Sequence, residues 1–178
     1  MKTLPLRYFP DGILFQKCEP VPEVTDEIRT LAQDMILTMM IEKGIGLAAP
    51  QVGKLLRMFV VDVEWPKGTE QADPHVFINP TVEFKGPLIK SVEDCLSFPG
   101  ETAELERAKE ILVRALGLDG QEFVMEADGV LAVAIQHEND HLEGKTFSDR
   151  LSWLRKSGVQ KRVKKKLRDQ KRAAAKKS

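Results

Sequence analysis

The five residues from His137 to His141 have the types and spacing needed to hold and use a metal ion. They read His-Glu-Asn-Asp-His and contain two of the three histidines in the chain. On an α-helix, side chains four positions apart project from nearly the same face, since each residue turns the helix by about 100°. A metal held by His137 and His141 would therefore have the Glu138 carboxylate beside its open coordination position. This is the minimum set for metal-assisted hydrolysis.

The segment that carries these residues is predicted to be a buried helix. Residues 130–135 are all apolar, Asp128 could cap the start of the helix, and Gly144 could end it. A helix that is apolar on nearly every side belongs in the middle of a domain. Polar side chains buried there without partners cost roughly a few kcal/mol each. A bound metal would remove that cost, which argues against two surface histidines spaced by chance.

The rest of the chain predicts an α+β fold. The predicted elements are a helix at 25–43 and strands at 57–63, 76–78, 110–115 and 122–126. Gly44 is expected to end the first helix, and Asn79-Pro80 follows the second strand. Asp119-Gly120 between the last two strands is typical of a hairpin turn. We therefore expect antiparallel β-sheets surrounding a central metal-binding helix.

The formal net charge of zero conceals a division of the chain into two parts. Residues 1–150 carry 15 Lys and Arg against 26 Asp and Glu, whereas residues 151–178 carry 12 against one. The second part also contains apolar residues at roughly helical spacing: Leu151, Leu154, Val159, Val163 and Leu167. We expect a catalytic domain at 1–150 and a basic amphipathic helix and tail at 151–178 that frays after Leu167. Such a tail could fold onto its acidic body or reach RNA or a membrane surface.

The composition is that of an ordinary globular protein of 178 residues, with 42% hydrophobic and 30% charged residues. No apolar run approaches the roughly 20 residues of a membrane span, and the first residues lack the apolar core of a secretory signal. We expect a cytoplasmic protein with no membrane association. The two cysteines, Cys18 and Cys95, indicate no disulfide framework.

A catalytic metal usually takes three protein ligands, so the two histidines need a partner. Metzincin proteases would have a third histidine six positions after the second, where this chain has Phe147. Thermolysin-like proteases use a downstream glutamate, and no glutamate follows Glu143. Cys95 remains as a candidate, although a lone cysteine is more often a small buried apolar residue.

Three segments together resemble the motifs of one enzyme family. They read Gly-Ile-Gly-Leu-Ala-Ala-Pro-Gln at 44–51, Glu-Asp-Cys-Leu-Ser at 93–97 and Gln-His-Glu-Asn-Asp-His-Leu at 136–142. Their content and order resemble those of the peptide deformylases, over roughly residues 4 to 150. The resemblance implies a metal-dependent hydrolase that removes the N-formyl group from the N-terminal formyl-methionine of nascent polypeptides.

The resemblance also implies a set of metal ligands. Cys95, His137 and His141 would bind one divalent metal, with water as the fourth ligand, and Glu138 would act as general base. The family resemblance implies Fe²⁺ as the physiological metal, with Zn²⁺, Ni²⁺ or Co²⁺ as substitutes. Ligand chemistry by itself does not select iron, since a Cys-His-His site suits zinc at least as well.

The remaining roles implied by the resemblance concern the substrate. The Gln51 side chain and the Leu96 backbone N–H would stabilise the oxyanion that forms at the formyl group. The peptide would bind by extended backbone pairing, with its methionine in an apolar pocket. The candidate pocket residues, for which ordinary core packing is the alternative, are Ile45, Gly46, Val130, Val133 and Ala134.

Two positions depart from the family pattern. Asp94 stands where the family usually has glycine, and Thr102 stands where several relatives carry arginine near the substrate. The carboxylate adds negative charge near the site, and we expect Asp94→Gly to leave fold and metal content intact and to change catalytic efficiency by less than about tenfold.

Two other functions stay open at this point. One is a zinc metalloprotease, which would cleave unblocked peptides. The other is a ribosome-binding or RNA-binding protein with a structural metal. In some bacterial deformylases a C-terminal helix docks on the ribosome, so the basic tail is also compatible with the enzyme. Deleting the residues after Leu154 is then expected to weaken ribosome binding in a salt-dependent way.

Overall fold

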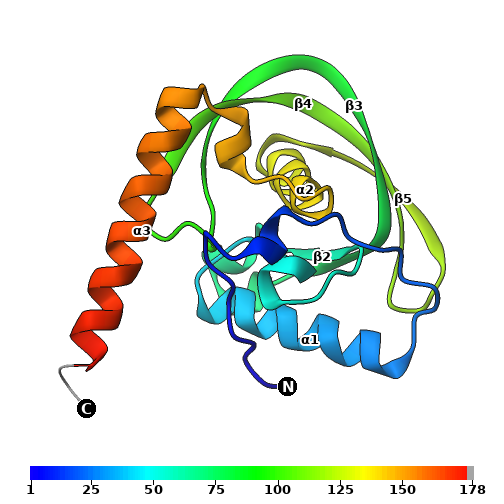
Figure 1. The fold of residues 1–178 in the computed structure, drawn as a ribbon. Helices are drawn as coiled ribbons and strands as arrows, with labels where there is room; N and C mark the ends of the chain where they lie inside the picture. Colours follow the sequence, from blue (N-terminus) through cyan, green and yellow to red (C-terminus); the bar gives the residue numbers. More distant parts are fainter. Residues whose placement is uncertain (176–178) are drawn as a thin grey trace.

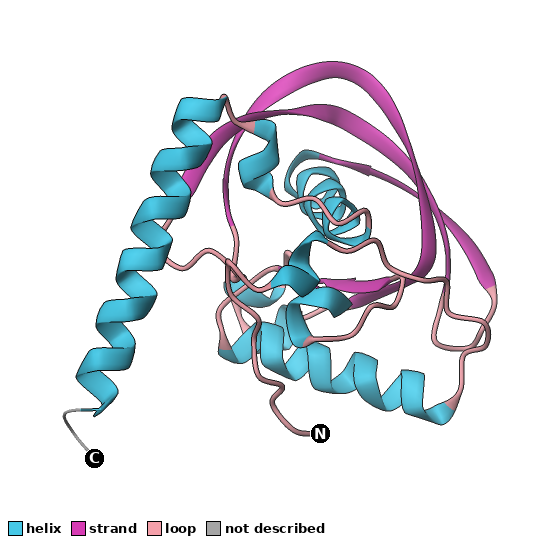
Figure 2. Ribbon diagram, viewed as in Figure 1, coloured by secondary structure: helices cyan, strands magenta, loops and turns pink. Residues whose placement is uncertain are grey.

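The structure is a computed structural model that describes residues 1–175 (Figures 1 and 2). Within this range the helices are α1 (Asp26–Ile41), α2 (Gly129–Leu142) and α3 (Trp153–Ala175). The strands are β1 (Gly46–Ala48), β2 (Met58–Val61), β3 (His75–Asp94), β4 (Thr102–Leu116) and β5 (Glu122–Asp128). The strands form one sheet in the order β1-β2-β3-β4-β5, and all neighbouring pairs are antiparallel.

The sheet curls around α2, which lies at the centre of the molecule (Figure 1). On the inner side of the sheet, Phe59 of β2, Phe77 of β3 and Val113 of β4 belong to the same buried cluster as Ala132 and Ile135 of α2. The near-continuous apolar run before His137 is therefore explained by burial on several sides. The predicted α+β fold around a central helix is confirmed, and its antiparallel strands belong to one continuous sheet.

The strand β3 is much longer than the sequence pattern predicted. Asn79 and Pro80 were expected to mark its end, but they form an irregularity within it, after which pairing with β4 resumes at Thr81. Asn79 has a φ of 52°, which asparagine tolerates better than most residues. Its side chain accepts a hydrogen bond from the Val21 N–H and donates one to the Val21 carbonyl, both at 2.8 Å. The turn-forming pair thus anchors the N-terminal segment to the sheet.

The two glycines that were expected to end helices behave differently. Gly144 has a φ of +68° directly after α2, and a Cβ there would lie 2.8 Å from the Phe15 carbonyl oxygen. That prediction is confirmed. After α1, however, the residue with the left-handed conformation is Lys43, with a φ of 60°. Gly44 instead allows close packing, since a Cβ at this position would lie 2.8 Å from the Leu96 side chain.

The basic helix α3 packs along one side of the body (Figure 1). Val159 and Val163 are buried in a cluster that also contains Phe98, Phe147 and Cys95. The prediction that Leu154 belongs to the apolar face is wrong, because its side chain is 74% exposed. The helix also continues beyond the point where fraying was expected, to Ala175. Lys176 and Lys177 lie outside the described residues.

Contacts with acidic residues fix the helix further. Arg162 forms an ion pair with Glu101 at 2.6 Å, and Lys156 pairs with Asp149 at 2.5 Å. Part of the basic tail therefore folds back onto the acidic body, one of the two arrangements that the charge split allowed. Across residues 1–175, no helix has the length and apolarity needed to cross a membrane.

Candidate active site

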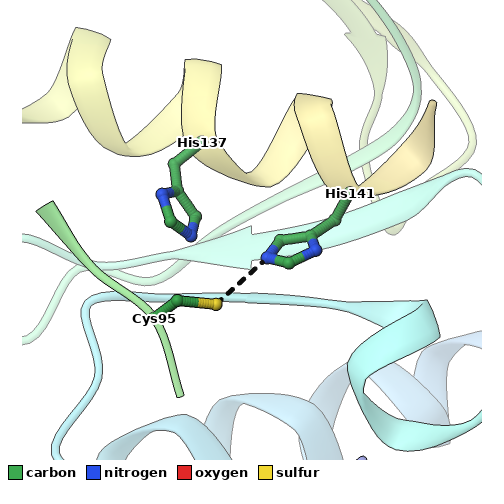
Figure 3. Close-up of side chains that lie close together, drawn as sticks. All are labelled: Cys95, His137 and His141. Atoms are coloured by element: carbon green, nitrogen blue, oxygen red, sulfur yellow. Dashed lines mark hydrogen bonds between the residues drawn. The ribbon is translucent and has the colours of Figure 1, made fainter. Parts of the chain in front are cut away.

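Cys95, His137 and His141 come together in the interior of the protein (Figure 3). One ligand atom from each lies within 4.8 Å of the others, and Cys95 Sγ is 3.4 Å from His141 Nε2. Cys95 directly follows the end of β3, and the two histidines lie one turn apart on α2. A strand end and a helix, separated by about 40 residues of sequence, therefore jointly build the cluster.

The donor set fits a divalent metal ion. Zinc bonds of about 2.3 Å to sulfur and 2.0 Å to nitrogen place two ligands of a tetrahedral ion about 3.5 Å apart. The 3.4 Å between Cys95 Sγ and His141 Nε2 is close to that value. Burial, followed by the nearby positive charge of His137, lowers the pKa of His141 to about 3, so its ring is neutral and can act as a ligand. The protein therefore offers a site for one divalent metal.

A carboxylate on β3 orients the first histidine. Glu93 Oε2 lies 2.8 Å from His137 Nδ1, which leaves Nε2 of His137 for the cluster. Arg107 on β4 donates to both oxygens of the same carboxylate, at 2.7 and 2.8 Å. Metal-binding histidines commonly have such a carboxylate partner, which fixes the tautomer and the ring orientation.

Arg107 also connects the metal helix to the residues that precede α3. Its Nη1 donates to Asp140 Oδ2 at 2.7 Å, and Arg150 donates to both oxygens of Asp140 at 2.6 Å. The side chains of Arg107, Glu93 and Asp140 are 1%, 4% and 10% exposed. Because two carboxylates face two guanidinium groups, these charges balance within the buried network.

Sequence reasoning missed this network, although two signals were present. Glu93 lies two positions before Cys95 at the end of β3, so continued alternation places both side chains on the same face. Arg107 occupies an inward position in the alternating pattern of β4, after Ala103 and Leu105. A charged residue at an inward strand position indicates a buried partner of opposite charge.

Glu138 directly follows His137 on α2, and it is 4% exposed. Burial raises its pKa to about 7, with His137 acting in the opposite direction and Glu93 adding to the rise. Its Oε2 has no hydrogen-bond partner among the described residues. A carboxylate with a pKa near neutrality can both accept and return a proton at physiological pH.

The first glycine-rich motif makes room for Glu138. A Cβ on Gly46 would collide with the Glu138 carboxylate, which approaches the backbone of β1 at this point. Glycine is therefore required at position 46 because the Glu138 side chain approaches the backbone closely, and not because the backbone angle is unusual. The structure thus joins the motif at 44–51 directly to the motif at 136–142.

Gln51 and Leu96 present hydrogen-bond donors beside Cys95. The side-chain oxygen of Gln51, Oε1, accepts a hydrogen bond from the Ala48 N–H at 2.8 Å. This directs the side-chain nitrogen, Nε2, toward Cys95 Sγ at 3.6 Å and Ser97 Oγ at 3.2 Å. The Leu96 N–H donates no hydrogen bond to any residue in 1–175. Two N–H donors therefore lie on the Cys95 side of the cluster.

A cavity of about 400 Å³ opens next to the cluster. It is bordered by Gly44–Gly46, by residues 89–96 and by the first half of α2. All the predicted site residues except His141 line it: Ile45, Gly46, Gln51, Cys95, Leu96, Val130, Val133, Ala134, His137 and Glu138. His141 is fully buried behind it. The volume is within the range of small-ligand sites, about 300 to 1,000 Å³.

A Cys-His-His metal site with a buried carboxylate at the end of an apolar cavity defines a metal-dependent hydrolase. The family model described as polypeptide deformylase matches residues 3–157. The chain belongs to this family, whose enzymes act on N-formylmethionine of nascent peptides. The resemblance predicted from the three motifs is confirmed.

Individual relatives agree with this assignment. A peptide deformylase of Acinetobacter baumannii is 45% identical over 176 residues, which covers 97% of this chain and 96% of the relative. Peptide deformylase 1 of Clostridium perfringens is 47% identical over 144 residues, 81% of this chain and 95% of the relative. The crystal structure of a peptide deformylase from Legionella pneumophila has a TM-score of 0.89 at 35% identity, covering 96% of this chain and 98% of that one.

Proposed function

We propose that Glu138 carries the proton in the deformylation of N-formylmethionyl peptides by this chain. The observation that carries the proposal is the buried Glu138 carboxylate, with one unpartnered oxygen and a pKa of about 7, beside the Cys-His-His cluster. Glu138 would accept a proton from the attacking water as the water oxygen bonds to the formyl carbon. It would return that proton to the amine nitrogen when the C–N bond breaks, which releases formate and a free N-terminus.

Cys95, His137 and His141 would hold the metal that this chemistry requires. A divalent ion bound there lowers the pKa of a water molecule and polarises the formyl carbonyl. We propose Fe²⁺ as the physiological ion on the basis of the family resemblance, with Zn²⁺, Ni²⁺ or Co²⁺ as substitutes. Metal analysis after anaerobic purification, combined with deformylation assays of each metal form, tests this assignment.

Gln51 and Leu96 would stabilise the charge that develops on the formyl oxygen. The hydrogen bond from the Ala48 N–H fixes the side-chain amide of Gln51. The amide nitrogen lies 3.6 Å from Cys95 Sγ, a weak contact that a bond to the formyl oxygen would replace. The unpaired Leu96 N–H would supply the second donor. Removing one such donor in other hydrolases costs about 10²- to 10³-fold in rate.

The substrate would enter the cavity as an extended peptide. Among residues 1–175, β1 is an edge strand and residues 89–94 of β3 pair only with β4, so both segments have a free backbone edge at the cavity. A peptide can hydrogen bond to such edges. The methionine side chain would pack against the apolar walls, which include Ile45, Val133 and Ala134, while Val130 lies at the mouth.

We further propose that α3 and the residues after it bind the ribosome, in the cytoplasm, while residues 1–150 form the catalytic domain. The exposed side of α3 forms a basic surface that includes Lys161, Lys164, Lys165 and Arg168. Clustered lysine and arginine side chains favour ribosomal RNA through its phosphates.

The activity itself is tested by comparing formylated with unblocked methionyl peptides. We expect hydrolysis of the formyl-Met peptides only, and loss of that activity in Glu138→Ala. Cleavage of internal bonds in unblocked peptides would favour the metalloprotease alternative. Full activity of Glu138→Ala would contradict the role proposed for this carboxylate.

A further inference from the structure

Asp94 is an acidic residue without a partner at the cavity. It is the last residue of β3, directly precedes Cys95 and lines the cavity. The residue is exposed, and its carboxylate forms no ion pair or hydrogen bond with other residues in the described part of the chain. An exposed, unpaired charge at the wall of a binding cavity is available to a ligand.

The other charged residues that line the cavity are neutralised or buried. The Lys90 ammonium pairs with Glu104 at 3.1 Å, and Glu93 pairs with Arg107 at 2.7 Å. Glu138 is buried beside His137. Asp94 is therefore the lining charge that remains uncompensated in residues 1–175.

The neighbouring strand does not supply a compensating cation. Thr102 of β4 is directly opposite Asp94 in the ladder, where side chains lie about 5 Å apart. The next outward-facing residues of β4 are Glu104 and Glu106, which are also acidic. Glu106 lines a separate groove, which it shares with Arg155.

We propose that Asp94 makes this enzyme prefer formyl-methionyl peptides with lysine or arginine directly after the methionine or one position further on. The inference rests on the proposed function of the same site. The formyl group must reach the cluster beside Cys95, and an extended peptide advances by about 3.3 Å per residue. The first residues after the methionine therefore pass the end of β3, where a cationic side chain can approach the Asp94 carboxylate.

The test compares kcat/KM for three formyl-Met-Ala-Xaa peptides and three formyl-Met-Xaa-Ala peptides, with Lys, Gln or Glu as Xaa. At low ionic strength we expect the Lys peptide of at least one series to exceed the Glu peptide by about fivefold, the range of an exposed charge pair. The preference should shrink in 0.5 M salt, where the Debye length falls to about 4 Å.

Two variants identify the residue responsible. Asp94→Asn removes the charge at almost constant shape and should bring the Lys to Glu ratio close to one, as should Thr102→Arg, which places a cation opposite Asp94. Glu106→Gln is the matched control, since it removes an exposed carboxylate of the same strand pair outside the cavity, and it should leave the ratio unchanged.

These measurements distinguish the role of Asp94 from the deformylase activity itself. Equal kcat/KM for all peptides in the wild-type enzyme, or a preference that persists in Asp94→Asn, would overturn the role of Asp94 and leave deformylation standing. Hydrolysis of none of the formylated peptides would overturn the proposed function, and the inference about Asp94 with it.

Discussion

Glu93 and His137, 44 residues apart in sequence, are joined by a 2.8 Å contact between Glu93 Oε2 and His137 Nδ1. Since Arg107 holds both oxygens of the same carboxylate, Glu93 cannot rotate away without breaking several charged contacts. The ring of His137 is therefore fixed before any metal binds.

Glu93→Gln is expected to weaken metal binding by about 10- to 100-fold, because a carboxylate partner of a ligating histidine raises its basicity and orients it. The metal dissociation constant of the stripped protein, measured by competition with a chelator, checks this. Glu83→Gln, an exposed change on the same strand, is the control. An unchanged constant in Glu93→Gln would show that Arg107 and packing alone orient the ring.

The folded protein is expected to lose stability in acid because the pKa of Glu93 is lowered. Burial raises the pKa of Glu93, but hydrogen bonds and charges from Arg107 and His137 outweigh this and lower it from 4.5 to about 2. Because the folded pKa is depressed, the stabilisation is present above pH 4.5 and is lost as the pH falls toward 2. A difference of about 2.5 units corresponds to about 3 kcal/mol.

Urea unfolding of the metal-free protein between pH 6 and pH 2.5 measures this loss. The free energy of unfolding should fall less steeply in Glu93→Gln than in the wild type. A remaining slope is expected from Asp140. Burial acts to raise its pKa, but the hydrogen bonds from Arg150 and the charge of Arg107 outweigh this and lower it. Identical slopes for the two proteins would contradict the prediction.

Glu138→Gln is expected to lower kcat by about 10²- to 10⁴-fold, the usual contribution of a general acid–base group. The glutamine keeps the shape of the side chain but cannot accept the proton. Metal content, measured on the same samples, should stay at the wild-type value. A variant that lost the metal would show instead that Glu138 acts through the metal site.

The same substitution is expected to stabilise the metal-free protein at high pH. The folded pKa of about 7 lies above the ordinary value of 4.5, so ionising Glu138 costs stability as the pH rises from about 4.5 to 7. The gain at pH 8 should approach about 3 kcal/mol and vanish below pH 4.5. Thermal unfolding at pH 8 and pH 4 measures it, and an equal effect at both values would argue against a charge-based cause.

Arg150→Gln is expected to reduce the free energy of unfolding by about 1 to 3 kcal/mol, because Asp140 is buried and would lose two charged hydrogen bonds. Arg155→Gln is the matched control, since Arg155 is exposed and forms no ion pair in the described range. Denaturant unfolding of the two variants compares them directly. Equal stability would mean that Arg107 alone satisfies Asp140.

Replacing Lys161, Lys165 and Arg168 by glutamine is expected to weaken ribosome binding with little effect on activity toward short peptides. This test is sharper than deleting the residues after Leu154, because deletion would also remove Val159 and Val163 from the cluster that contains Cys95. Each lost phosphate contact should reduce the slope of log affinity against log salt by about 0.7 to 0.9.

The control for this experiment removes three exposed lysines from the body: Lys54, Lys67 and Lys109. Both triple variants change the net charge equally, so a general electrostatic effect would weaken ribosome binding in both. We expect a reduced slope only for the substitutions on α3. Equal reductions would contradict a specific role of this helix.

The sequence by itself determined the local features of this protein. The spacing of His137 and His141, the apolar run before them and Gly144 after them specify a buried helix with two ligands on one face, because helix periodicity and capping act within a few residues. The family and the candidate ligands followed from three short motifs. The turn at Asp119-Gly120 between two strand-like segments likewise predicted the hairpin.

Only the tertiary structure decided which distant groups meet. Local signals can indicate that Arg107 is buried with an acidic partner, but they do not show that it lies between Glu93 and Asp140. Nor do they show that Gly46 makes room for Glu138 or that Thr102 is opposite Asp94. The length of β3, the exposure of Leu154 and the extent of α3 were misjudged for the same reason, since pairing and packing across the fold override local turn and charge signals. The sequence shows which side chains can act as ligands, acids or bases. Long-range packing decides which partners surround them, and these partners set the pKa, the orientation and the pairing of each charge.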